Sequence, residues 1–498
     1  MVYNDLIDLL ETVDDAELLN EAEQSLTGYE EEHPELLRSV TPYLIYLPED
    51  RSAVFDVCVA GSDGHVIAHM IDRLYANATV WWIANTGLYD ETYDGRMDVV
   101  VFSEKTARRA MTETSLIEKW GRGTLKPGGR LLMMISGEQS TVGAFYNACN
   151  CHGFAVDSID SNHMAVARKT VPVILDNDRR QRYDHIYVLC PVSCKSGGAE
   201  LLHQLVYWIN AQSGNAEIAY MQWGDRQVAC HPEYADYVAG HIIRKEDIVD
   251  SENNAVIVPE GWTNESLNFR HTVQYLWWLS VDNYLVTRNN DPEDARRFLA
   301  TIDRKAHRHL VQSAYARDYL IKNGVDNGKI GYLSDYINQT YLDHEKDALR
   351  KEKKDLILYN PKKGAEYVQA LVDRAPDLPW RPIQGLTTIE AGELMRSAKV
   401  YIDFGNHPGK DRIPREAAMS GCVVITGRRG AAAFREDVPI PEKYKLSEEE
   451  NTCEDVLRMI RQSLADYETA VSDFADYRKR IAAEKEQFIR DVRDLFFV

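Results

Sequence analysis

Residues 401–427 read YIDFGNHPGKDRIPREAAMSGCVVITG, and this stretch decides the fold of the C-terminal part of the chain. It begins with an apolar run that ends at Phe404 and closes with a second run over 422–426. A polar loop and a short segment that ends at Gly421 lie between them. Short apolar runs bounded by turn residues are typical of strands buried on both faces of a parallel sheet. The stretch therefore predicts a strand, a loop, a short helix and a second strand.

Charges of both signs gather in the loop of this stretch. Lys410, Asp411 and Arg412 follow one another, and we place Glu416 in the first turn of a helix that begins after Pro414. Charged side chains at such a position are costly to bury unless a ligand or an ion partner compensates them. The loop is therefore a candidate ligand site, and a purely structural network of ion pairs is the alternative.

A second strand end carries two cations. Residues 356–364 read LILYNPKKG, which predicts a strand followed by Asn360, Lys362 and Lys363. Ligands of open α/β sheets bind beyond the carboxyl ends of the strands, where two lysines would neutralise a diphosphate. The plain alternative is a solvated pair of lysines in a loop.

A glycine-containing loop follows another expected strand. Residues 191–200 read PVSCKSGGAE, so we place Gly197 and Gly198 in the loop, just before a helix that begins at Ala199. Small residues there let backbone N–H groups at a helix N-terminus approach a diphosphate or a sugar. A tight turn that serves packing alone is the alternative.

The same alternation of strands and helices recurs along the chain and predicts an α/β protein. We expect strands at 54–60, 79–84, 98–102, 131–135, 186–190, 255–258, 276–280, 309–312, 356–359 and 399–404. The polar stretch 176–182 is interpreted as a linker, and the charged run 343–354 as a boundary. The expected parts are an acidic helical lead (1–45), three α/β domains (46–172, 183–345 and 346–498), and a helical tail within the last one.

The composition of the chain argues against several classes of function. The net charge is −21, from 57 Lys and Arg against 78 Asp and Glu, which argues against a general nucleic-acid-binding surface. The eight cysteines show neither a disulfide framework nor the spacing of a zinc site, so we expect reduced thiols and no metal. With neither a signal peptide nor a long apolar run in this sequence, we expect a cytoplasmic protein.

Residues 50–170 resemble a class I, S-adenosylmethionine-dependent methyltransferase. The resemblance rests on three features, which are VCVAGSDG at 57–64, LKPGGR at 125–130, and a glycine at 153 before a closing hairpin. It implies cofactor contacts from Gly61, Asp63 and Asn85. The second strand ends in Asn85 where that class carries a carboxylate. An active methyltransferase and a degenerate docking domain therefore both stay open, with S-adenosylmethionine as the cofactor of the first.

Residues 183–498 resemble retaining GT-B glycosyltransferases, the large family of sucrose-synthase-like and polysaccharide-building enzymes. The segments GGAE (197–200), VQSAYARDYLIKNGV (311–325) and REAAMSGCVVITG (415–427) carry the resemblance. It implies a pair of Rossmann-like domains, the second of which binds the donor nucleotide, and a last helix that crosses back over the first. By this comparison Glu416 contacts the donor ribose, Lys362 and Lys363 bind the diphosphate, and 384–388 lies near the nucleobase.

This sequence departs from the family at two positions. Pro408 stands where the family carries an earlier glutamate, and Asp282 or Asn283 stands near its usual histidine. The catalytic candidates are therefore Glu416, Asp411 and Asp282. The candidates for donor binding are Gly197, Gly198, Asn360, Lys362, Lys363, Gln384, Lys410 and Arg412.

The resemblance implies metal-independent, retaining transfer of a sugar from a nucleotide sugar to a glycan or a surface-polymer precursor. UDP and GDP are the favoured nucleotides, although the base stays open. Two alternatives are a bifunctional enzyme that also methylates its acceptor and a non-catalytic scaffold that binds sugar nucleotides. The sequence leaves the oligomeric state open.

Overall fold

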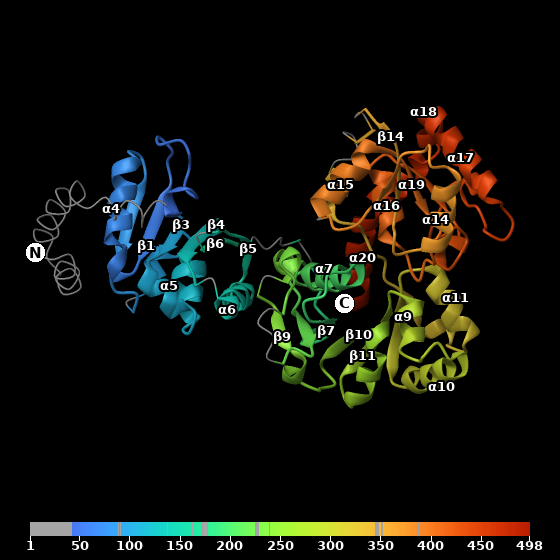
Figure 1. Cartoon of the computed structure of the whole chain (residues 1–498). Helices are drawn as coiled ribbons and strands as arrows, with labels where there is room; N and C mark the ends of the chain where they lie inside the picture. The colour runs from blue at the N-terminus through green and yellow to red at the C-terminus, as the bar shows by residue number, and fades with distance from the viewer. Residues whose placement is uncertain are drawn as a thin grey trace, which may run out of the picture. The chain divides into compact units, whose positions relative to one another are not determined.

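A computed structural model describes residues 42–498, except 88, 90, 137, 162, 171–174, 176–177, 225–228, 239, 344–347, 350–351 and 387. The acidic lead expected over residues 1–45 thus lies almost wholly outside the described residues. The chain divides into two compact units. One comprises residues 1–176, 190–211 and 216–248, and the other comprises 177–189, 212–215 and 249–498. The described residues form three sheets flanked by helices, which confirms the α/β class (Figure 1).

The first sheet has the strand order β2-β1-β3-β4-β6-β5. Strands β1 to β4 run parallel, and β6 is antiparallel to both β4 and β5, so the closing hairpin predicted from sequence is confirmed. Its elements are β1 (Asp56–Ala60), α4 (His65–Leu74), β2 (Thr79–Ile83), β3 (Met97–Phe102), α5 (Glu104–Ala110), β4 (Leu125–Met134), α6 (Gln139–Cys151), β5 (Phe154–Ile159) and β6 (Met164–Lys169).

The turn expected at 125–129 is instead part of β4. Met97 pairs with Leu125 and Val99 with Arg130, so the intervening residues bulge out of the strand. Gly128 has a φ of +77°, which a residue with a side chain rarely adopts. A proline and two glycines in sequence indicate a turn, but they also suit a bulge inside a strand.

The second sheet has the order β13-β12-β11-β10-β7-β8-β9. The register is parallel from β7 through β10, β11 and β12 to β13, and between β8 and β9. Its strands are β7 (Ile186–Pro191), β8 (Ala216–Met221), β9 (Ile242–Arg244), β10 (Ala255–Pro259), β11 (Val273–Trp278), β12 (Ala306–Val311) and β13 (Ile330–Tyr332). The helices are α7 (Gly197–Ala211), α8 (Ala235–Val238), α9 (Val281–Val286), α10 (Pro292–Asp303), α11 (Ala314–Lys322) and α12 (Gln339–Asp343).

The third sheet is parallel, with the order β15-β14-β16-β17. Its strands are β14 (Lys354–Tyr359), β15 (Trp380–Pro382), β16 (Ala398–Asp403) and β17 (Val423–Thr426), and its helices are α14 (Ala365–Arg374), α15 (Thr388–Ser397) and α16 (Arg412–Met419). Buried residues of these elements form one apolar core with the helical tail. The second and third sheets are thus two successive parallel α/β sheets, as the sequence predicts.

The tail consists of α17 (Cys453–Ala465), α18 (Tyr467–Ser472), α19 (Ala475–Ala482) and α20 (Glu484–Phe496). Helix α20 packs on the second sheet, where Phe488 stacks on Trp277 at 6.4 Å and Phe496 meets Tyr275 edge-on at 5.5 Å. The predicted return of the last helix to the first of the two sheets is therefore confirmed. Across the described residues, no helix combines the length and apolar character needed to cross a membrane.

Candidate functional site

The candidate site lies at the carboxyl edge of the third sheet. Strand β14 pairs with β15 on one side and with β16 on the other, so the strand order changes direction between β14 and β16. Loops that leave a parallel sheet at such a switch point form the usual ligand crevice of open α/β folds. Here they are residues 360–364 and 404–411, the two loops that sequence analysis selected.

The loop after β14 is shaped by local hydrogen bonds and a close backbone contact. The Asn360 Oδ1 accepts a hydrogen bond from the Lys362 N–H at 3.0 Å, which turns the chain. Gly364 has a φ of +59°, and a Cβ there would lie 2.7 Å from the Phe404 carbonyl oxygen. Glycine is therefore required for the two loops to touch. Lys362 is exposed, whereas Lys363 forms an ion pair with Asp411.

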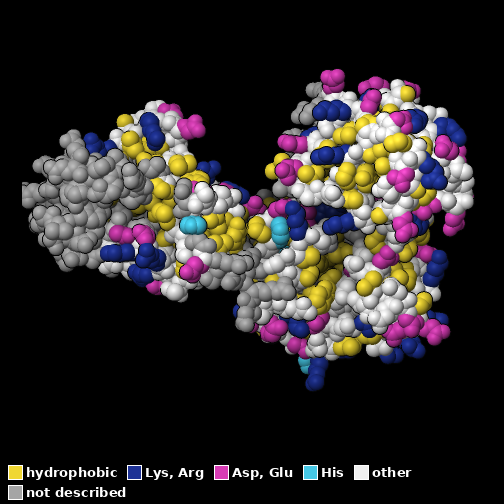
Figure 2. Space-filling model, viewed as in Figure 1, with side chains coloured by type: hydrophobic (Ala, Val, Ile, Leu, Met, Phe, Trp, Pro, Cys, Tyr) yellow, Lys and Arg dark blue, Asp and Glu magenta, His cyan; other side chains and the backbone are white. Residues whose placement is uncertain are grey.

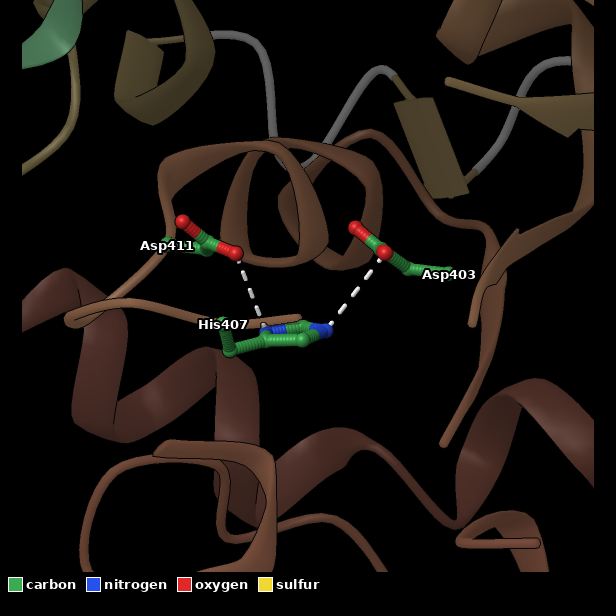
Figure 3. Close-up of side chains that lie close together, drawn as sticks. All are labelled: Asp403, His407 and Asp411. Atoms are coloured by element: carbon green, nitrogen blue, oxygen red, sulfur yellow. Dashed lines mark ion pairs between the residues drawn. The ribbon is translucent and has the colours of Figure 1, made fainter. Parts of the chain in front are cut away.

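The loop after β16 holds a buried histidine between two carboxylates (Figure 3). The His407 Nε2 lies 3.5 Å from the Asp403 Oδ1, and its Nδ1 lies 3.2 Å from the Asp411 Oδ2. His407 is 0% exposed and Asp403 only 2% exposed. Because Lys363 contacts the same Asp411 oxygen, the four side chains form one network of alternating charge.

Burial and charge oppose each other in this network. Burial alone would lower the pKa of His407, but the nearby carboxylates of Asp403 and Asp411 raise it overall. Burial would raise the pKa of Asp403, yet attraction to His407 and the hydrogen bond from the Tyr401 hydroxyl lower it. Burial dominates at Asp411, whose pKa is raised although His407 and Lys363 oppose the change. The network therefore favours an imidazolium at His407.

Asp403, His407 and Asp411 could also be considered as metal ligands, since one ligand atom of each lies within 4.8 Å of the others. Their arrangement fits a metal poorly. The two ring nitrogens face different carboxylates, and the ammonium group of Lys363 already occupies the Asp411 oxygen. A metal would require a neutral imidazole and displacement of that ammonium. Asp403, His407 and Asp411 therefore fit a network of ion pairs better than a metal site.

Asp282 is brought to this loop from the second sheet. Its carboxylate accepts a hydrogen bond from the Asn406 side chain. The Val281 N–H also donates to the Pro408 carbonyl at 2.8 Å. The predicted candidates Asp282 and Asp411 therefore flank one loop.

Glu260 is a buried acid beside this position that sequence analysis missed. It follows β10, and its carboxylate accepts hydrogen bonds from the Leu279 N–H at 3.0 Å and the Asn283 side chain at 3.1 Å. Burial raises the pKa of Glu260 to about 7, although these hydrogen bonds lower it. The available signal was a charged residue directly after a fully apolar strand.

Glu416 lies one turn deeper in its helix than the sequence suggested. Helix α16 begins at Arg412, so Pro414 lies within its first turn and Glu416 follows in the second. The expected start after Pro414 is wrong because proline is tolerated in the first turn, where its missing N–H would have no helical partner. Arg412 Nε lies 3.7 Å from the Glu416 Oε1.

Lys410 points into a buried ion network rather than toward Lys362. Its Nζ lies 2.7 Å from Glu484 and 3.4 Å from Asp335. Both carboxylates also bind Arg415, which is 0% exposed. For Lys410, the structural network that sequence analysis left open is the observed arrangement, and its contact with a donor remains only a prediction.

The remaining candidates for donor binding belong to other elements of the chain. Gln384 is exposed in the loop after β15, and residue 387 of the segment 384–388 lies outside the described residues. Gly197 and Gly198 are the first two residues of α7 and not, as expected from sequence, part of the loop before it; they belong to the other compact unit. In the loop before them, Lys195 is paired with Glu233.

The three candidates in the N-terminal domain serve local structure. The Asp63 carboxylate accepts hydrogen bonds from the Ser103 hydroxyl and, at 3.0 Å, from the Lys105 N–H. Gly61 has a φ of +127°, and a Cβ there would collide with Ser103. The Asn85 Oδ1 accepts from the Gly87 N–H at 3.0 Å. Methyltransferase cofactor binding by these residues stays a prediction.

No family model and no curated protein matches this sequence. Among solved structures, the chain is similar to HepE of Anabaena in complex with UDP and glucose, with 8% identity, 64% of this chain and 98% of that chain covered, and a TM-score of 0.44. It is also similar to sucrose-phosphate synthase of Thermosynechococcus elongatus, with 15% identity, 64% and 98% coverage, and a TM-score of 0.47. A third similarity is to the antibiotic-resistance methyltransferase Kmr, with 9% identity, 25% and 94% coverage, and a TM-score of 0.21. At these scores and identities the similarities assign no activity to the chain.

Proposed function

We propose that residues 183–498 form a GT-B glycosyltransferase that uses a nucleotide sugar as donor. The observation that carries the proposal is an exposed Lys362 at the switch point of a parallel sheet, beside the buried network of His407. Within the described residues Lys362 makes no ion pair, whereas Lys363 is bound to Asp411. A cation left without a counter-ion at this edge suits the diphosphate of a donor.

The donor would extend from this lysine along the two loops. Its diphosphate would contact Lys362 and the N-terminal N–H groups of α14, where the helix dipole favours negative charge. Glu416 would bind the ribose, as the resemblance implies. The sugar would then lie toward Asp411 and Asp282, which flank the loop after β16. Lys362 would stabilise the departing diphosphate without a metal.

The finer parts of the proposal rest on the family resemblance. We propose retention of configuration, UDP or GDP as the nucleotide, and a glycan or surface-polymer precursor as the acceptor. Pro408 replaces the family's earlier glutamate, so in this proposal Asp411 contacts the sugar instead. His407 holds the carboxylate of Asp411 in place.

Nucleotide binding by matched lysine variants tests this proposal. UDP, GDP, CDP, ADP and dTDP are titrated calorimetrically into the wild type, Lys362→Ala and Lys354→Ala. Lys354 is an exposed lysine at the opposite end of β14, so its variant removes the same charge away from the site. We expect one nucleotide to bind the wild type and Lys354→Ala equally, and Lys362→Ala at least about tenfold more weakly.

Two results would contradict the proposal. One is equal affinity of all three proteins, and the other is the absence of binding by every nucleotide. Turnover of the matching nucleotide sugar, followed with a panel of glycan acceptors, then separates a transferase from a scaffold, which would bind the nucleotide without consuming the donor.

A further inference from the structure

A second site is suggested by a cavity at the opposite, amino edge of the second sheet. The cavity has a volume of about 660 Å³. Its lining includes Arg180, Arg182 and Tyr183 ahead of β7, Tyr275 near the start of β11, and residues 307–308 near the start of β12. We call it the amino-edge cavity. The candidate donor site lies instead at a carboxyl edge, which separates the two functions in space.

Two of the arginines are held in place by the backbone of the last residues. The Arg182 N–H donates to the Phe496 carbonyl at 2.8 Å, and the Val498 N–H donates to the Arg180 carbonyl at 2.8 Å. Gln181 forms an antiparallel bridge with Phe497 between them. Residues i and i+2 of an extended segment point to the same side, and both Arg180 and Arg182 line the cavity. The backbone pairing with residues 496–498 therefore places both arginines beside the same cavity.

The charges of the cavity are not balanced. Arg180, Arg182 and Arg308 line it, and within the described residues none of the three forms an ion pair. Of the lining carboxylates, Asp494 is bound to Arg179 at 2.9 Å, which leaves Asp184 and the main-chain carboxylate of Val498 against the three arginines.

Such an imbalance is unusual for this chain. Its net charge is −21, so carboxylates outnumber cations. Basic and acidic side chains are interspersed over the surface that Figure 2 shows. Three arginines that line one cavity and form no ion pair within the described residues therefore point to an anionic ligand.

The geometry also limits the chemical class of that ligand. One guanidinium group can donate two parallel hydrogen bonds to the oxygens of a phosphate. Several guanidinium groups around one cavity therefore suit a ligand with more than one negative charge. The volume is that of a small-molecule site and exceeds the need of a bare phosphate. The Tyr183 and Tyr275 hydroxyls, 2.7 Å apart, and the His307 ring, 5.3 Å from Tyr275, offer polar and aromatic contacts to an organic part.

We propose that the amino-edge cavity binds a small organic phosphate with at least two negative charges, such as a sugar phosphate. The site is separate from the proposed donor site. An occupant would lie beside residue 495 near the end of α20, the helix whose first residue, Glu484, belongs to the ion network around Arg415. The ligand would therefore stabilise the helix that joins the two sheets.

Calorimetric titration of the full chain with glucose 6-phosphate and with pyrophosphate tests the proposal. The variant Arg182→Ala/Arg308→Ala removes two lining cations, and the matched control Arg296→Ala/Arg304→Ala removes two exposed arginines outside the lining. We expect saturable binding of glucose 6-phosphate to the wild type and the control, and at least about tenfold weaker binding to the first variant. Arg308→Lys, which keeps the charge but loses the paired donors, should lie between them.

The Lys362→Ala variant separates this site from the donor site. If it binds glucose 6-phosphate as the wild type does, the binding belongs to the amino-edge cavity. Loss of binding in Lys362→Ala, equal binding by Arg182→Ala/Arg308→Ala, or no binding of either probe would each overturn the proposal. Unchanged melting temperatures of all variants exclude misfolding as the cause, and failure of nucleotide binding at Lys362 leaves these outcomes unaffected.

Discussion

The Val281 N–H donates to the carbonyl of Pro408 over 2.8 Å, and this bond attaches the loop after β16 to the start of α9. The next residue, Gly409, lies so close that a Cβ there would collide with the Leu279 carbonyl oxygen. The contact therefore fixes the loop that carries His407 and Asp411 against residues that follow β11.

Gly409→Ala should displace this loop. Because the collision is with backbone, the loop must move, at a cost of about 1–3 kcal/mol in the free energy of unfolding. Urea denaturation measures this loss, and nucleotide titration should show weaker binding. Gly261→Ala is the control, since a Cβ there would be 3.8 Å from Asn283, an ordinary contact. Equal stability of both variants would show that the loop is not held as described.

His407→Ala should be strongly destabilising because it leaves the buried Asp403 without its cation. Loss of one partner of a buried ion pair typically costs about 3–5 kcal/mol. Asp403→Asn/His407→Ala removes the stranded charge as well, so it should unfold at a higher urea concentration than His407→Ala alone. If the double variant is the less stable of the two, the charge on Asp403 is not what His407 compensates.

Glu260 should make the stability depend on pH. Its pKa is raised from 4.5 to about 7 by burial, so the folded protein keeps a proton that the unfolded chain loses. Its contribution is fully present below pH 4.5 and is lost as the pH rises to about 7, by a total of about 3 kcal/mol. Relative to the wild type, Glu260→Gln should therefore be more stable at pH 8 than at pH 5. A stability difference that is the same at both pH values would contradict this assignment.

Divalent ions should not stabilise the network around His407, because the Lys363 ammonium occupies the Asp411 oxygen. We expect the melting temperature and any transferase activity to be unchanged after dialysis against EDTA and after addition of Mg²⁺, Mn²⁺ or Zn²⁺. A rise in melting temperature that the wild type shows and Asp411→Asn loses would instead identify a metal site there.

The sequence predicts most of the sheets because their strands are apolar runs long enough to recognise. Strands β9, β13 and β15 have only three residues each, too few for such a pattern, and they were missed. The longer β8 was missed as well, although its residues, AEIAYM, are mostly buried.

The site was predicted at the level of loops but not of side chains. Lys363 and Lys410 both stand in charged loops, yet one contacts Asp411 and the other is buried against Glu484. Loop residues follow no periodic rule that would tell which way each side chain points. Glu260 was missed because its role depends on burial by residues that follow β11.

The guanidinium group of Arg415 binds Asp335, in the segment that leads out of the second sheet, and Glu484, where α20 starts its return. Each of the two chain segments that connect the second and third sheets thus contributes one carboxylate to the same cation, Arg415. A fragment that ends at residue 345 would keep Asp335 without its cation, and one that begins at residue 346 would lack a carboxylate of the same cluster. We therefore expect the two sheets to fold as a single cooperative unit, so that neither can be produced alone as a stable fragment.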